Sequence, residues 1–170
     1  MSSHEITSRT ALRNLIASLA SWQAWTDEDA SGAAARIAWP EYTALQFPFI
    51  VIVLLGGSRN NLLGSDSSAN FRPRGGLGVI VVDKVADETD LMTSDTTFGT
   101  NFFELIDDLI DASHASGLII DQIGYGENPY TLSATNTSIP SDGDSDDEDD
   151  EATIEQKFWT GVFEIRTGGV

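Results

Sequence analysis

The chain has 170 residues and a formal net charge of −18, with 27 acidic residues against nine basic ones. This length supports one well-formed hydrophobic core, and we therefore expect a single α/β domain over residues 1–170. The absence of cysteine excludes disulfides, thiolate metal ligands and thiol nucleophiles, and a surface this acidic repels nucleic acid and anionic membranes.

An amphipathic helix is predicted first, from Thr7 to Trp25, with Thr7 or Ser8 as its N-cap. Its apolar positions recur at the spacing of one helical face: Leu12, Leu15, Ile16, Leu19 and Trp22. The stretch from Ala33 to Trp39 is predicted either as a short helix or as an irregular approach to the sheet. No basic region followed by an apolar block precedes these elements, so we expect no signal peptide and synthesis inside the cell.

Two apolar runs then predict strands at 49–55 and 77–83, joined as an antiparallel hairpin with a wide loop. The loop, Ser58 to Arg74, holds three of the nine basic residues. Long loops in small domains are usually functional or disordered. The longest apolar run, Phe47 to Leu55, is far shorter than the roughly 20 residues that span a bilayer, so we expect a buried strand and no membrane anchor.

A second helix is predicted to begin near Thr97 or Thr100 and to end at Gly117, a left-handed C-cap. Its apolar stripe consists of Phe102, Phe103, Ile106, Leu109 and Ile110. A strand over 118–125, a short extended piece over 130–133 and a closing strand over 157–166 follow. The pattern predicts an α+β fold, with a mixed, mainly antiparallel four-stranded sheet and two helices packed on one face.

An acidic segment interrupts this pattern between Ala134 and Thr153, where eight of the ten residues from Asp142 to Glu151 are acidic. Like charges at this density do not pack, so we expect a solvated, mobile excursion at 134–153. Asp142, Asp144 and Asp146 copy the first ligand positions of a calcium loop, but the required glycine is missing. Weak cation binding by Asp142 to Glu155 is therefore favoured over a defined site.

The second helix carries four carboxylates at helical spacing: Glu104, Asp107, Asp108 and Asp111. Such a set can act as acid and base or hold a divalent ion, but an ordinary solvated face is the favoured interpretation. Gly75, Gly76 and Gly78 open a strand, whereas a phosphate loop opens a helix. We therefore predict no catalytic residue, no metal site and no cofactor.

Aromatic and arginine side chains outside the predicted core are the best candidates for a protein interface, where both residue types are enriched. We predict an interface, either with a neighbouring subunit or with another component of an assembly, formed by Arg59, Phe71, Arg72, Arg74 and Trp159. The arginines of the loop can meet the acidic surface of an identical copy.

The carboxylates are distributed along the whole chain, whereas lysine occurs only at Lys84 and Lys157. Such a surface resembles proteins of salt-loving archaea, in which high salt screens the repulsion between carboxylates. An acidic protein of an ordinary organism is the alternative, and the halophilic interpretation is preferred.

The order of segments resembles the tail terminator, or tail-completion, proteins of long-tailed viruses. The resemblance rests on RTALRNLI, FPFIVIVLLGG, GGLGVIVVD, FFELIDDLIDASHASG, IIDQIGYGENPY and FWTGVFEIR, taken in this order. It covers most of the chain and consists of pattern rather than a diagnostic motif. The excursion at 134–153 departs from the short connection expected at that place.

The resemblance implies a homo-oligomeric ring, commonly a hexamer, that terminates the tail tube and joins it to the neck. Its partners would be further copies of itself, the tail tube protein and a neck or head-closure protein, with DNA as passing cargo. Such a protein is not an enzyme, binds no cofactor, is assembled in the host cytoplasm and resides at the tail–neck junction of the virion. The alternatives are another head–tail connector component and, more distantly, a small divalent-metal hydrolase.

Overall fold

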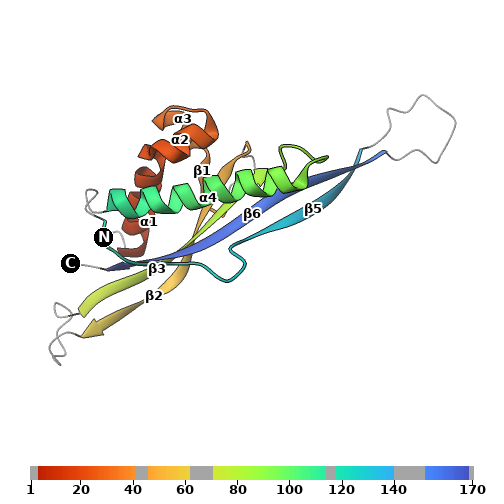
Figure 1. Ribbon diagram of the computed structural model, residues 1–170. Coiled ribbons are helices and arrows are strands. Elements are labelled where there is room, and N and C mark those ends of the chain that lie inside the picture. Colours follow the sequence, from red (N-terminus) through yellow and green to blue (C-terminus); the bar gives the residue numbers. More distant parts are fainter. Residues whose placement is uncertain (1–3, 41–45, 62–70, 114–117, 140–151, 169–170) are drawn as a thin grey trace.

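A computed structural model describes residues 4–40, 46–61, 71–113, 118–139 and 152–168. These residues form α1 (His4–Ser18), α2 (Ala20–Thr26), α3 (Ala30–Ala35), β1 (Ile37–Ala38), β2 (Phe49–Asn61), β3 (Phe71–Lys84), α4 (Leu91–Ser113), β4 (Ile120–Gly124), β5 (Tyr130–Ile139) and β6 (Ala152–Gly168). Figure 1 shows the helices on one side of a twisted sheet.

The sheet has the strand order β1-β2-β3-β6-β4. β4 pairs with the C-terminal part of β6, and β5 pairs with the N-terminal part of β6. Only the β1–β2 pairing is parallel. The predicted α+β class with a mixed, mainly antiparallel sheet is confirmed. The predicted four strands and two helices are wrong, because the described residues form six strands and four helices.

The predicted β2–β3 hairpin is longer than expected, and β5 and β6, predicted as a short extended piece and a closing strand, form a second long hairpin. β2 and β3 stay paired out to Asn61 and Phe71, and β5 and β6 stay paired out to Ile139 and Ala152. The predicted loop over 58–74 and excursion over 134–153 are therefore strand at their flanks, and residues 62–70 and 140–151 lie outside the described residues. Backbone pairing across the hairpins extended strands that side-chain hydrophobicity alone did not indicate.

The predicted first helix is divided in two at Leu19, whose extended backbone (φ −72°, ψ 134°) ends α1 and begins α2. The predicted start of the second long helix is also wrong, because α4 begins at Leu91. Asp90 caps it: its side chain accepts from the backbone N–H and the hydroxyl of Thr93, at 3.0 and 2.7 Å. These bonds lower the pKa of Asp90.

The core lies between the helices and one face of the sheet. Along β6, alternate residues from Trp159 to Thr167 are buried, as a strand with one covered face requires. Trp22, Phe102 and Phe163 are fully buried at its centre. Aromatic rings meet there edge to face, with Phe102 and Phe163 centroids 5.8 Å apart.

A tryptophan and a carboxylate are paired at the border of this core. The indole N–H of Trp25 donates to the Asp83 carboxylate at 2.9 Å. Burial raises the pKa of Asp83, and this effect outweighs the opposing influence of the Trp25 hydrogen bond and of Lys84. A carboxylate is held here at the end of β3 because it orients the tryptophan that packs beside α4.

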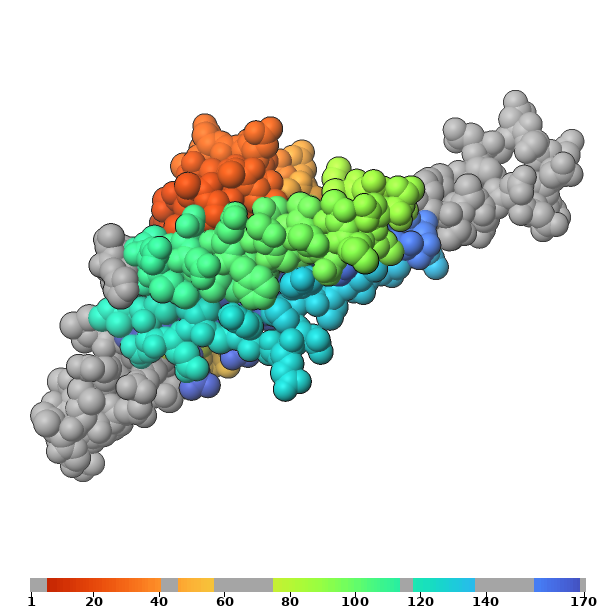
Figure 2. All heavy atoms as spheres, viewed as in Figure 1, coloured from red at the N-terminus to blue at the C-terminus, as the bar shows by residue number. Residues whose placement is uncertain are grey.

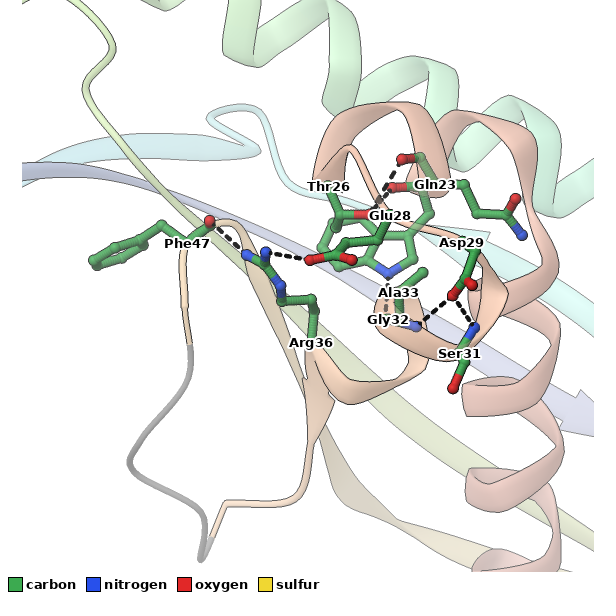
Figure 3. A network of polar contacts seen from close by, with 10 residues as sticks. Gln23, Thr26, Glu28, Asp29, Ser31, Gly32, Ala33, Arg36 and Phe47 are labelled. Atoms are coloured by element: carbon green, nitrogen blue, oxygen red, sulfur yellow. Dashed lines mark hydrogen bonds and ion pairs between the residues drawn. The ribbon is translucent and has the colours of Figure 1, made fainter.

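Arg36 holds the irregular segment around α3 against the start of β2 (Figure 3). Its guanidinium donates to the backbone carbonyl of Phe47 at 2.7 Å and to the carboxylate of Glu28 at 2.8 Å. Asp29 caps α3 by accepting from the N–H groups of Ser31 and Gly32, both at 2.9 Å. The stretch over 33–39, predicted as a short helix or an irregular approach to the sheet, holds the end of α3 and the two-residue strand β1.

The two hydrogen bonds of the Arg36 side chain should contribute differently to the stability of the fold. Arg36→Gln, which is too short to reach Phe47, is expected to lower the free energy of unfolding by about 1–2 kcal/mol, because a partly buried carbonyl loses a charged donor. Glu28→Gln keeps an acceptor, and the Glu28 side chain is 37% exposed, so it should cost less than about 1 kcal/mol. Urea unfolding monitored by circular dichroism measures both, and equal losses would contradict this ranking.

Candidate subunit interface

The large apolar side chains that remain exposed gather mainly at two opposite edges of the sheet. On the β4 side, five of them lie along α4, β4 and β5, and we call this set the α4–β4 flank: Phe103, Ile110, Ile119, Tyr125 and Leu132. Figure 2 shows α4 and residues 118–136, in green and cyan, forming one uninterrupted surface. At the opposite edge, β2 exposes Leu54 and Leu55.

The α4–β4 flank arises because the apolar stripe of α4 is wider than the arc that the sheet covers. Phe103 and Ile110 are seven residues apart, so they lie two turns apart on one line of the helix. They are 36% and 43% exposed. The predicted apolar stripe of α4 is therefore only partly buried: Phe102, Ile106 and Leu109 are buried, whereas Phe103 and Ile110 remain exposed.

Tyr125 supports the flank from the segment after β4. Its ring meets Phe103 edge to face with centroids 5.6 Å apart, and Phe103 in turn contacts Phe102 in the core at 5.5 Å. The exposed rings are thus anchored to buried ones, and the flank has a defined shape before any partner binds.

A cavity of about 450 Å³ borders this flank where the chain leaves β4 and enters β5. Its lining includes Tyr125, Pro129, Tyr130, Val162 and Glu164. Burial, and secondarily the charge of Asp95, raises the pKa of Tyr130. The cavity combines apolar walls with phenol and carboxylate groups, so it suits an inserted side chain of a neighbouring protein.

The β2 edge is open because β1 is short. β1 pairs with β2 only at Ile50 and Val51, and among the described residues the rest of β2 pairs with β3 alone. Leu54 and Leu55 lie in this open stretch and are 44% and 49% exposed. Exposed apolar edge strands commonly pair with another chain.

The sheet face away from the helices adds further apolar surface. Val51, Ile80 and Val162 share one cross-strand row on that face, and Val162 is 44% exposed. Leu55 lies over Gly78, where a Cβ would approach its side chain to 3.3 Å.

The structure separates the predicted interface residues. Arg59 pairs with Pro73, and Arg74 with Ser58, on the β2–β3 hairpin, so the backbone brings the arginine-bearing segments together. The side chains of Arg59, Phe71, Arg72 and Arg74 lie outside the described residues.

Trp159 does not meet the condition for an exposed anchor. It is 7% exposed, its indole N–H donates to the Ser94 hydroxyl at 2.9 Å, and its ring stacks on Phe98. Trp159 therefore belongs to the core of the described fold, since the alternation along β6 directs it towards α4.

The four α4 carboxylates do not act as one set. Asp108 accepts from the backbone N–H of Ser21 at 3.1 Å and so holds the start of α2 against α4, whereas Glu104, Asp107 and Asp111 are exposed. Within the described part of the chain, no three His, Asp or Glu side chains are placed to hold a metal ion. No described helix is long and apolar enough to cross a membrane.

Sequence reasoning missed the β2 edge and the α4–β4 flank. The available signal was the dipeptide Leu54-Leu55, because two adjacent residues of a strand point to opposite faces and cannot both enter one core. Comparison with models of protein families finds no matching family, and a search of curated proteins finds no significant match.

Proposed function

We propose that the protein is a structural subunit that assembles into a homo-oligomeric ring. The observation that carries the proposal is the placement of exposed apolar residues at two different edges of one sheet. Two distinct, non-overlapping surfaces on one chain favour head-to-tail contacts, and head-to-tail contacts close into rings when the rotation between copies permits it.

The charge of the chain supports this interpretation. With a net charge of −18, copies repel one another except where uncharged surface meets uncharged surface. The β2 edge is such a place, because its exposed Leu54 and Leu55 are apolar, whereas at the α4–β4 flank the apolar side chains lie among exposed carboxylates such as Asp107. High salt screens the remaining repulsion, which is consistent with the proposed halophilic origin.

The resemblance of the segment order to tail terminator proteins supports a position for the ring in a virion. We propose that it ends the tail tube of a long-tailed virus of a salt-loving archaeon, joins the tube to the neck and carries no catalytic activity. An acidic ring is suited to this position, because repulsion of phosphates lets DNA pass without binding.

Changing the flank tests the assembly. The double variant Phe103→Gln, Ile110→Gln should remain folded, because both side chains are exposed, and should shift the mass in light scattering from a ring to a monomer. The matched control, Thr97→Gln with Thr100→Gln, alters other exposed positions of the same helix and should leave the ring intact. An unchanged mass for the Phe103, Ile110 variant contradicts a role of this flank.

The place in the virion is tested separately. Purified protein is mixed with isolated tail tubes and with portal-bearing heads of the source virus and imaged by electron microscopy. Rings at tube ends support a tail terminator, whereas rings at the portal indicate a head-closure or adaptor protein. Absence of binding to either contradicts the proposed position.

A further inference from the structure

We infer that the sheet continues from one copy to the next, with β4 of one subunit pairing antiparallel to β2 of its neighbour. The inference rests on the proposed ring and specifies its joint. It starts from two strand edges that are open among the described residues: β2 beyond Val51, and the side of β4 that faces away from β6.

The strand directions permit this pairing. β2 runs antiparallel to β3, and β3 runs antiparallel to β6, so β2 and β6 point the same way. β4 is antiparallel to β6 and therefore opposite to β2. When two copies lie side by side with their helices on the same side, β4 meets the neighbouring β2 in the antiparallel sense.

The two edges also lie at the same height on the sheet. A single cross-strand row runs through Leu54 of β2, Leu77 of β3, Ile165 of β6 and Ile123 of β4. A neighbour related by rotation about an axis along the strands therefore brings Ile123 beside Leu54 without sliding. Ring symmetry requires such a relation, since each copy must repeat the last one at the same level.

The backbone of β2 directs its hydrogen-bonding groups outwards at this row. The N–H of Ile50 points away from β3, because it donates to the carbonyl of Arg36 at 2.8 Å. Strand geometry repeats every two residues, so the N–H of Leu54, four residues on, points the same way. Leu54 lies beyond the end of β1, because β1 pairs with β2 no further than Val51.

The backbone of β4 is complementary. The N–H of Val162 donates to Pro129 at 2.8 Å, so it points towards the β4 and β5 side of β6. Ile165 lies three residues further and points the opposite way, towards β3. Its pair with Ile123 is therefore of the type without mutual hydrogen bonds, and the N–H of Ile123 points outwards.

Leu54 and Ile123 of adjacent copies can thus exchange two backbone hydrogen bonds. Their side chains share the helix-side face, since both belong to the row of the buried Leu77 and Ile165. Leu54 would extend the hydrophobic core across the joint and lose its exposure.

Disulfide cross-linking tests the joint directly, because the natural chain has no cysteine. In a hydrogen-bonded antiparallel pair the Cα atoms are about 5.5 Å apart, within the range of a disulfide. The double variant Leu54→Cys, Ile123→Cys should, on mild oxidation of the assembled protein, give a ladder of multiples of 18.3 kDa on non-reducing gels.

The control is Leu54→Cys with Leu132→Cys. Leu132 has a similar exposure of 39% and lies at the same edge of β6, but it pairs with Trp159, six residues from Ile165. This variant should assemble and give no ladder. Each single variant should also assemble and remain uncross-linked.

The outcomes separate the joint from the ring. Rings without a ladder overturn the β2–β4 pairing and leave the proposed ring standing. A covalent dimer from Leu54→Cys alone overturns it in favour of a two-fold contact between β2 edges. Absence of both rings and ladder in high salt overturns the pairing and the proposed function together.

Discussion

Replacement of Trp22 by alanine is expected to lower the free energy of unfolding by about 3–5 kcal/mol, the range for truncating a buried aromatic residue. Trp22 is fully buried, and its ring meets Trp25 edge to face at 5.7 Å. Its indole N–H donates to the carbonyl of Ala33 at 3.1 Å. Alanine removes the packing and leaves that buried carbonyl without its donor. Urea unfolding in high salt, monitored by circular dichroism, measures the loss.

The variant Trp22→Phe separates these contributions. Phenylalanine keeps most of the apolar volume and loses the N–H, so its cost should be clearly smaller than that of alanine. A loss below about 1 kcal/mol for Trp22→Ala would contradict the central position of this residue, because a truncation of this size in a packed core leaves a cavity.

Gly161→Ala is expected to destabilise the fold by about 1–3 kcal/mol, as overpacking of a dense core does. A Cβ at Gly161 would lie only 2.6 Å from Cδ2 of Phe102. Phe102 is fully buried and cannot turn away, since Phe98 and Phe163 contact its ring. β6 needs glycine at position 161 because the Phe102 ring of α4 packs directly on the backbone of β6 there.

Two further variants sharpen this test. Gly126→Ala adds the same methyl group where nothing lies within 4 Å, so it should leave stability within about 0.5 kcal/mol of the natural chain. The double variant Gly161→Ala, Phe102→Leu should be less destabilised than the sum of its single variants, because the smaller side chain relieves the clash. Simple additivity of the two losses would contradict direct contact between these positions.

Hydrophobic periodicity was enough to predict the mixed class, the β2–β3 hairpin and the buried side of α4. It was insufficient for the extent of the elements. The start of α4 depends on Asp90, a capping residue that lies among other polar residues and does not stand out by composition. The ends of β2, β3, β5 and β6 depend on partner strands, and pairing between distant segments is not visible in local sequence.

The candidate interface was harder to predict than the fold, because exposure is a tertiary property. Phe103 and Phe102 are adjacent and chemically identical, yet one is exposed and the other fully buried. Tryptophan is a residue type enriched at interfaces, but the register of β6 against β3 directs Trp159 into the core. Which member of an apolar stripe remains outside is decided by the width of the covering sheet.

The proposed pairing of open edges would allow a strongly acidic chain to assemble. Backbone pairing between β4 and β2 needs no charged side chain, and it satisfies N–H and C=O groups that otherwise face solvent. Salt then controls the balance, because it screens repulsion between copies while leaving apolar contacts in place. Assembly should consequently strengthen as salt rises, the reverse of what surface ion pairs would give.

The central claim, closure into a homo-oligomeric ring, is tested most directly by the mass of the purified protein across a salt series. Multi-angle light scattering should give one assembly at high salt, with a mass equal to a fixed integer multiple of 18.3 kDa, and smaller species as salt is removed. A folded protein that stays at 18.3 kDa at every salt concentration would contradict the ring.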